Sequence, residues 1–161
     1  MVQAILIPHE MDKPIALQGF DRLSVMQLAV GGYVEPVFIE KHSMTIYANE
    51  EGKIHQLPVN RRATCLWWLF APEMRGLDII VGDIVLVGSA RGRGSMTALD
   101  PELKQLLFDT DSFKIEIQSQ FDAHIWRPCQ ERFYDFFVAG MFGLNLVKPV
   151  APGNDVRVVA A

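Results

Sequence analysis

The sequence predicts an α+β fold, with helices packed on a mixed or mainly antiparallel sheet. The chain has 161 residues, of which 50% are hydrophobic and 21% charged, and this is the composition of a compact globular protein. Strand-like and helix-like segments follow one another, but without the regular alternation that builds a doubly wound parallel sheet. In addition, the turn sequence at residues 49–52 (NEEG) joins two strand-like segments directly, which favours antiparallel pairing.

Glycine and proline limit the expected elements in the first half of the chain. Residues 4–8 predict a buried opening strand, because the segment is short, apolar and closed by a proline. A helix over residues 22–30, capped by Asp21, is expected to end at Gly31, since glycine adopts the left-handed conformation that follows many helices. The other expected elements are strands at 15–17, 33–40, 43–48 and 53–57 and a helix at 61–70.

Three residues add detail to these elements. Pro36 places its strand at a sheet edge or a bulge, because proline has no N–H to donate. Asn60 is a suitable N-cap for the helix at 61–70, where its side chain can accept a backbone N–H. Gly82 leaves two alternatives for residues 79–87, which form either one strand or two short ones around the glycine.

The second half of the chain begins with a glycine-rich connection at residues 88–95. Asp100 and Pro101 are expected to start a helix that runs to about residue 108, with the proline at the first helical position, and an alternating strand is expected at 113–117. Pro128 is expected to start the last helix, which runs to Met141. The sequence therefore predicts an α+β domain over 1–90, a helix–strand–helix extension packed on it as one unit over 91–148, and a partly disordered tail over 149–161.

Charge and targeting signals exclude several classes of protein. The net charge of −4 argues against a non-specific nucleic-acid binder. The N-terminus lacks the basic and long apolar regions of a signal peptide. The longest apolar-rich run, 136–147, is shorter than the roughly 20 residues of a membrane span. With only two widely separated cysteines, the chain is expected to be cytoplasmic, in a reducing compartment, with no membrane contact.

No cofactor, metal or catalytic residue is expected from the sequence. The four histidines share no ligand spacing. Cys65 lies in an apolar helical segment, which suggests an inert thiol, whereas Cys129 follows a proline at an expected helix start, where the helix dipole would lower the thiol pKa. A pairing of Cys129 with His124 is open, but no nucleophile elbow is present. His9 and His55 are the remaining candidates for a general base.

Arginine is the most informative polar residue, because every basic residue from position 61 to 93 is an arginine. Guanidinium groups bind phosphate through two hydrogen bonds, and the connection at 88–95 adds backbone N–H groups and hydroxyls that could cradle an anion. The start of the helix at 61–70 offers further donors. The alternative is a solvated surface loop and helix start. The candidate anion-binding residues are Asn60, Arg61, Arg62, Arg91, Arg93 and Ser95.

Aromatic side chains concentrate on two expected helices. Adjacent pairs such as Trp67 and Trp68 point in different directions, so one helix face cannot bury them all. They either pack into the core from both sides or form part of a homo-oligomer interface, where aromatic residues are enriched. The candidate interface residues are Trp67, Trp68, Trp126, Phe133, Phe136 and Phe137.

Three stretches, in this order and at these spacings, carry a family resemblance. They are residues 26–35 (MQLAVGGYVE), 49–53 (NEEGK) with 57–64 (LPVNRRAT), and 81–88 (VGDIVLVG). Over about residues 1–90 the chain resembles the domain of unknown function 3846, found mainly in bacteriophages, plasmids and their bacterial hosts. The resemblance implies a mobile-element accessory protein and transfers no catalytic residue. The shared residues are mostly turn and cap residues, namely Gly31, Gly32, Gly52, Pro58 and Asn60.

The expected function is that of an accessory binding protein of a mobile element, with a bacteriophage as the first choice. It would counteract host defence by binding a host protein or by sequestering a phosphorylated, nucleotide-like small molecule, and it is expected to be a homo-oligomer. Two alternatives remain open. One is an enzyme acting on a nucleotide or phosphate ester, with Arg61, Arg62 or Arg91 holding the phosphate. The other is an acidic DNA mimic that inhibits host nucleases.

Overall fold

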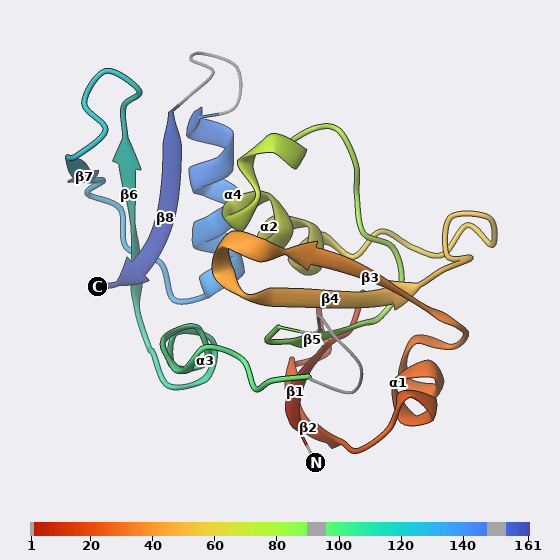
Figure 1. Ribbon diagram of the computed structural model, residues 1–161. Helices are drawn as coiled ribbons and strands as arrows, with labels where there is room; N and C mark the ends of the chain where they lie inside the picture. The colour runs from red at the N-terminus through yellow and green to blue at the C-terminus, as the bar shows by residue number, and fades with distance from the viewer. Residues whose placement is uncertain (1, 90–95, 148–153) are drawn as a thin grey trace. The chain divides into compact units, whose positions relative to one another are not determined.

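The computed structural model describes residues 2–89, 96–147 and 154–161, and within these ranges the chain forms two antiparallel sheets and four α-helices (Figure 1). This confirms the α+β fold class. The chain divides into two compact units: the first unit is Met1–Thr64 with Asp78–Asp100, and the second is Cys65–Leu77 with Pro101–Ala161. The division differs from the expected one near residue 90, because the second unit also takes a segment from the middle of the chain.

Five strands form the sheet of the first unit, in the order β2-β1-β5-β4-β3, with every neighbouring pair antiparallel. They are β1 (Val2–Ile7), β2 (Ala16–Phe20), β3 (Val34–Ile39), β4 (Met44–Asn49) and β5 (Ile84–Val87). The pairing aligns one apolar row across all five strands. In sheet order this row is Leu17, Ile5, Leu86, Ile46 and Val37. The central strand β5 is buried along its whole length, as expected for a strand covered on both faces.

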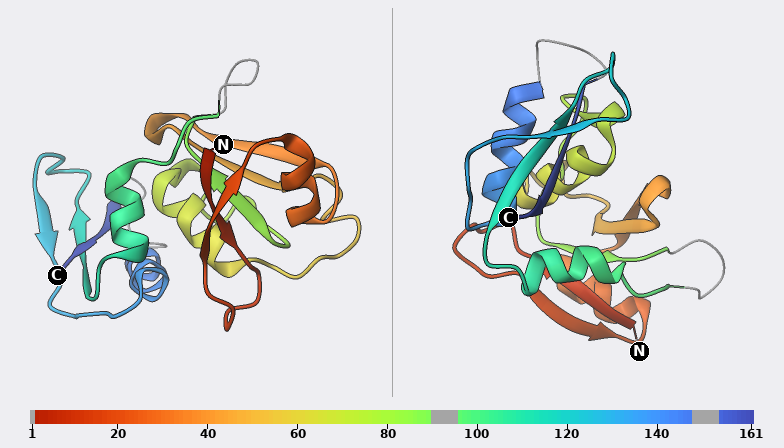
Figure 2. Two further views of the ribbon diagram at one scale, coloured as in Figure 1. Left: turned by 90° about the horizontal axis from the view of Figure 1, so that it is seen from below. Right: turned by 90° about the vertical axis from the view of Figure 1, so that its left-hand side faces the viewer.

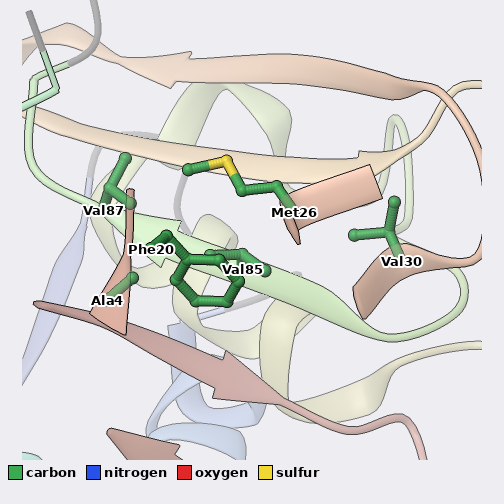
Figure 3. Close-up of a cluster of buried hydrophobic side chains, with 6 residues drawn as sticks. All are labelled: Ala4, Phe20, Met26, Val30, Val85 and Val87. Carbon is green, nitrogen blue, oxygen red and sulfur yellow. The ribbon is translucent and has the colours of Figure 1, made fainter. Parts of the chain in front are cut away.

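Helix α1 (Leu23–Val30) covers one face of this sheet and is held there by apolar packing. It ends at Gly31, whose φ of 78° is the predicted left-handed conformation. The predicted cap by Asp21 is wrong: Arg22 occupies the N-cap position and its side chain makes no cap hydrogen bond. The core cluster under the helix is shown in Figure 3 and consists of Ala4, Phe20, Met26, Val30, Val85 and Val87.

Strand β3 lies at the sheet edge, as Pro36 predicts. The N–H of Glu50 donates to the carbonyl of Tyr33 at 2.8 Å. With the register of β3 and β4, this bond shows which alternate residues of β3 form hydrogen bonds to β4. Residues 33 and 35 direct their backbone groups toward β4, so those of Pro36 point away from it. The missing N–H of Pro36 therefore costs no ladder hydrogen bond and removes one donor from an open edge. The short 3₁₀ helix η1 (Glu40–His42) connects β3 to β4.

The predicted returning strand at residues 53–57 is wrong. Residues 50–56 form turns, and the N–H of Leu57 donates to the carbonyl of Gly52 at 2.9 Å. Strand β4 already pairs with β3 on one side and β5 on the other, so neither of its edges is open to a third strand. Residues 79–87 form two short pieces around Gly82, the second of the two alternatives: Val81 makes an isolated bridge with Val59, and β5 follows.

Helix α2 (Arg61–Phe70) has the predicted limits, begins in the first unit and continues in the second. The short helix η2 (Pro72–Met74) follows it. The sheet of the second unit has the order β7-β6-β8 and is also antiparallel. Helix α4 packs on β6 and β8, as the views in Figure 2 show. The elements are α3 (Pro101–Phe108), β6 (Phe113–Gln118), β7 (Trp126–Pro128), α4 (Phe136–Val147) and β8 (Asp155–Ala160).

Two expectations for the second unit are wrong. Pro128 ends strand β7 instead of starting a helix. Helix α4 begins at Phe136, where the carboxylate of Asp135 accepts the N–H groups of Phe137 and Val138 at 2.8 and 2.9 Å. The end of the chain is not a disordered tail over residues 155–160, because β8 pairs with β6 along its full length. Residues 148–153 of that expected tail lie outside the described residues.

Candidate functional site

Asn60 joins three segments of the first unit where β1 ends, α2 begins and the chain approaches β5. Its side chain is fully buried. The amide Nδ2 donates to the carbonyls of Ile7 and Gly82, both at 2.9 Å, and Oδ1 accepts the N–H of Ala63 at 3.0 Å. The last bond confirms Asn60 as the N-cap of α2, whereas the first two were not predicted. We call residues 7–10, 60–62 and 82–83 the junction.

The two arginines of the junction face opposite environments. Arg62 is buried at 7% exposure, and its Nη2 donates to the carbonyl of Pro8 at 2.8 Å and to that of Glu10 at 3.0 Å. Its guanidinium therefore holds the segment after β1 against the first turn of α2. Arg61, one residue earlier, is exposed. Of the three candidate anion-binding residues in the junction, Asn60 and Arg62 thus serve the fold, and Arg61 faces solvent.

His9 and Asp83 form a pair in the junction that the sequence did not predict. Oδ1 of Asp83 accepts both the backbone N–H of His9 at 2.9 Å and its ring Nδ1 at 2.7 Å. Because an ionised carboxylate only accepts hydrogen bonds, the neutral ring carries its proton on Nδ1 and leaves Nε2 as the acceptor. The partners are 74 positions apart in sequence, and no local pattern links them. His55, the other candidate base, pairs with the exposed Glu51, four residues earlier in the same turn segment, at 2.9 Å.

The remaining candidate anion-binding residues, Arg91, Arg93 and Ser95, lie outside the described residues. Two residues that flank them, Ser89 and Thr97, are hydrogen-bonded to each other. The carbonyl of Ser89 accepts the N–H of Thr97 at 2.9 Å, and the N–H of Ser89 donates to Thr97 Oγ1 at the same distance. These residues follow the end of β5, whereas the junction precedes its start. Gly82 and Asp83 of the junction and Ser89 are therefore at opposite ends of β5, a strand about 10 Å long at 3.3 Å per residue.

The six aromatic residues proposed for an oligomer interface divide into two groups. Trp67, Phe136 and Phe137 are buried, and the rings of Phe136 and Phe137 pack edge to face at 5.3 Å. The half-buried members are Trp68, Trp126 and Phe133. The guanidinium of Arg157 lies 4.2 Å from the centre of the Trp126 ring, a cation–π arrangement. Strongly exposed apolar side chains occur elsewhere, most clearly at Phe121.

Neither cysteine has the surroundings of a reactive thiol. Burial, and secondarily the charge of Asp135, raises the pKa of Cys65 to about 12, so this thiol is protonated at neutral pH. Cys129 does not lie at a helix start, and its backbone N–H donates to the carbonyl of Ile115. Its pKa is raised, by burial first and by the charge of Glu131 second. The expected lowering by a helix dipole is therefore wrong, because no helix begins there.

The described residues contain neither a metal-binding cluster nor a membrane-spanning helix. Across residues 2–89, 96–147 and 154–161, no three His, Cys, Asp or Glu side chains gather in a way that could hold a metal ion. Within the part of the chain that the structure describes, no helix has both the length and the apolar character needed to cross a membrane.

The residues that carry the family resemblance mainly hold the first unit together. Asn49 donates from Nδ2 to the carbonyl of Val30 at 3.2 Å and accepts the N–H of Glu51 on Oδ1 at 2.9 Å. It thereby links the end of α1 to the turn after β4. The carbonyl of Pro58 accepts the N–H of Gly82 at 2.8 Å, next to the bonds of Asn60. Turns, caps and side-chain anchors of one antiparallel α+β unit thus account for most of the motif.

The fold of the first unit and its side-chain anchors define an antiparallel α+β protein. A comparison with known families shows which family it is. The chain belongs to the family described as Domain of unknown function (DUF3846), whose model matches residues 2–112. The match extends past the first 90 residues and includes helix α3 of the second unit. No curated protein and no solved structure matches the chain.

Proposed function

We propose that the chain is an accessory binding protein of a mobile element, in the first instance a bacteriophage, and that it counteracts a host defence in the host cytoplasm. This origin is supported by the sequence resemblance of the three motif stretches to a domain found mainly in bacteriophages and plasmids. The polar residues of the family motif support binding over catalysis. The side chains of Asn49, Asn60 and Arg62 bind backbone carbonyls of the fold and so are not free to act on a substrate. The exposed residues beside them, above all Arg61, are the ones that can contact a partner.

The ligand that suits this surface is a phosphorylated, nucleotide-like small molecule. Arg61 is exposed in the first turn of α2, and a guanidinium can bind two phosphate oxygens at once. The neighbouring segment is held in place by Arg62, so the surface around Arg61 is already ordered before a ligand arrives. Sequestering such a ligand requires no chemical step.

Replacing Arg61 with alanine is expected to weaken this binding by about 10- to 100-fold, since a hydrogen bond to a charged group contributes about 1.5–3 kcal/mol. The measurement is the thermal shift of the whole chain with nucleoside mono- and triphosphates and inorganic phosphate, followed by calorimetric titration of the strongest hit. Arg132→Ala, a change at an exposed arginine of the second unit, is the control and should bind like the wild type. Equal affinity for the Arg61→Ala and wild-type proteins would contradict the assignment.

A second candidate partner is another protein, either a host protein or a second copy of the chain. The observation that favours it is the exposure of large apolar side chains, at 89% for Phe121, 83% for Leu28 and 71% for Tyr33. Phe121 lies in an ordered loop, where its N–H donates to Oγ of Ser119 at 3.2 Å. An apolar side chain presented by an ordered loop is the kind of anchor that contributes most to protein interfaces.

Self-association is expected to depend on Phe121. Light scattering of the purified chain at micromolar concentration should show a dimer or larger species, and Phe121→Ser should weaken the association by about tenfold or more, the effect of losing one interface anchor. Leu77→Ser is the matched control, because Leu77 is 76% exposed in the same unit. A strictly monomeric wild-type protein would exclude the homo-oligomer and leave a host protein as the partner of this surface.

A further inference from the structure

The position of His9 is fixed by more contacts than a loop residue requires. Asp83 binds both its backbone N–H and its ring, and Arg62 binds the carbonyls of the residues on either side, Pro8 and Glu10. Four hydrogen bonds therefore hold three consecutive residues that belong to no helix or strand. Such fixing of an imidazole and its tautomer by a carboxylate is the arrangement that prepares a histidine to accept a proton.

The other ring nitrogen of His9, Nε2, is the acceptor that the contact of Nδ1 with Asp83 leaves available. Its nearest charged partner among the described residues is Oε1 of Glu10 at 3.9 Å from Nε2, which is beyond hydrogen-bond distance. The His9 side chain is 26% exposed. Glu10 is itself paired with Lys13 at 3.0 Å, which offsets its negative charge. The partly exposed His9 thus lies in the segment that Arg62 holds beside the first turn of α2, and Arg61 is in the same turn.

We propose that the His9–Asp83 pair is the general base of a hydrolytic site for phosphate esters, with Arg61 as the cation that holds the phosphoryl group. This inference rests on the proposed phosphorylated ligand and adds a reaction to it. Nε2 of His9 takes a proton from a water molecule while the water oxygen attacks phosphorus. The bond between phosphorus and the leaving oxygen breaks, and the imidazolium returns the proton to that oxygen. The products are an alcohol and a phosphate, and water is the only other reactant.

Asp83 acts in this site as a positioning residue. Its carboxylate holds the ring in the Nδ1–H tautomer and stabilises the imidazolium that forms after proton transfer. Asp83→Asn retains an oxygen for both hydrogen bonds and removes the charge. The variant should therefore lower kcat with little change in KM, whereas a purely structural role for Asp83 would leave kcat unchanged.

The test is hydrolysis of p-nitrophenyl phosphate and bis(p-nitrophenyl) phosphate by the whole chain. His9→Gln should reduce turnover about 100-fold or more, the usual contribution of a general base. His55→Gln is the matched control, because His55 also pairs with a carboxylate in the first unit, and it should retain full turnover. Equal urea midpoints for the three proteins establish that folding is unaffected.

The outcomes separate this inference from the proposed binding function. Wild-type turnover that His9→Gln abolishes, with nucleotide binding retained in the variant, supports the hydrolytic site. Nucleotide binding without turnover in the wild type overturns the hydrolytic site and leaves the binding function standing. Cleavage of p-nitrophenyl acetate but of neither phosphate ester overturns the substrate class. Independently, a nitrogen–proton NMR correlation of the ring should show the proton of neutral His9 on Nδ1, and a proton on Nε2 would overturn the role of Asp83.

Discussion

Asn60→Ala is expected to lower the free energy of unfolding by about 3–5 kcal/mol. The substitution removes three hydrogen bonds and leaves the carbonyls of Ile7 and Gly82 and the N–H of Ala63 without their partner in a buried region. A buried polar group left unsatisfied costs about 1–3 kcal/mol, and the losses at one site are not fully additive. A urea titration of the whole chain, followed by far-UV circular dichroism, measures the change.

Two further variants identify the cause of this loss. Asp135→Ala removes the cap at the start of α4, where water can replace the lost acceptor, and should cost about 1 kcal/mol. Asn60→Asp retains an acceptor for the cap but places a carboxylate against two carbonyl oxygens, so it should be at least as damaging as alanine. If Asn60→Ala costs no more than Asp135→Ala, burial of the junction is not what makes Asn60 important.

Gly88→Ala is expected to destabilise the chain by about 3 kcal/mol or more. A Cβ at this position would collide with the carbonyl oxygen of Ala98 and would lie 2.6 Å from Oγ1 and 2.8 Å from the carbonyl oxygen of Thr97. The two carbonyl oxygens are backbone atoms, and the same backbone is tied to Gly88 by the hydrogen bond from the Gly88 N–H to the Thr97 carbonyl at 3.0 Å. The collision can be relieved only by opening the end of β5, and overpacking of this kind costs about 1–3 kcal/mol or more. Thermal and urea unfolding monitor the effect.

Gly31→Ala provides the comparison for Gly88→Ala. Gly31 has a φ of 78°, and a Cβ added there would meet no atom within 4 Å beyond its chain neighbours, so alanine faces only the strain of the left-handed conformation. That strain costs about 1–2 kcal/mol. A loss at Gly88 no greater than the loss at Gly31 would mean that the end of β5 adjusts easily and that the close approach to residues 97–98 is not required.

Elements whose limits depend on neighbouring residues could be predicted from the sequence. Helix α2 occupies its predicted residues, because Asn60 caps the first turn and an apolar face follows. Gly31 ends α1 and Pro36 lies on an edge strand for equally local reasons, namely a permitted positive φ and a missing N–H. These properties belong to the residue itself and act wherever the segment lies in the fold.

Elements that need a distant partner could not be predicted in the same way. The local pattern of residues 53–57 favours a strand beside β4, but β3 and β5 occupy both of its edges. The end of the chain, with the composition of a disordered tail, becomes strand β8 because β6 offers it an open edge. Pro128 can start a helix or end a strand, and its pairing with Glu116 of β6 decides for the strand. In each case the outcome depends on which backbone groups of another segment remain unpaired.

The candidate site also combines features set by neighbouring residues with features set by distant partners. By itself the sequence determined the α+β class, the family, the N-cap at Asn60 and the presence of arginines at the start of α2. Only the tertiary structure decided that Arg62 turns inward to two carbonyls while Arg61 remains in solvent, and that Asp83 orients His9 from 74 positions away. Composition and local pattern fix which groups are present. Their direction and partners depend on long-range packing, because a buried polar group must find its hydrogen bonds wherever the fold places them.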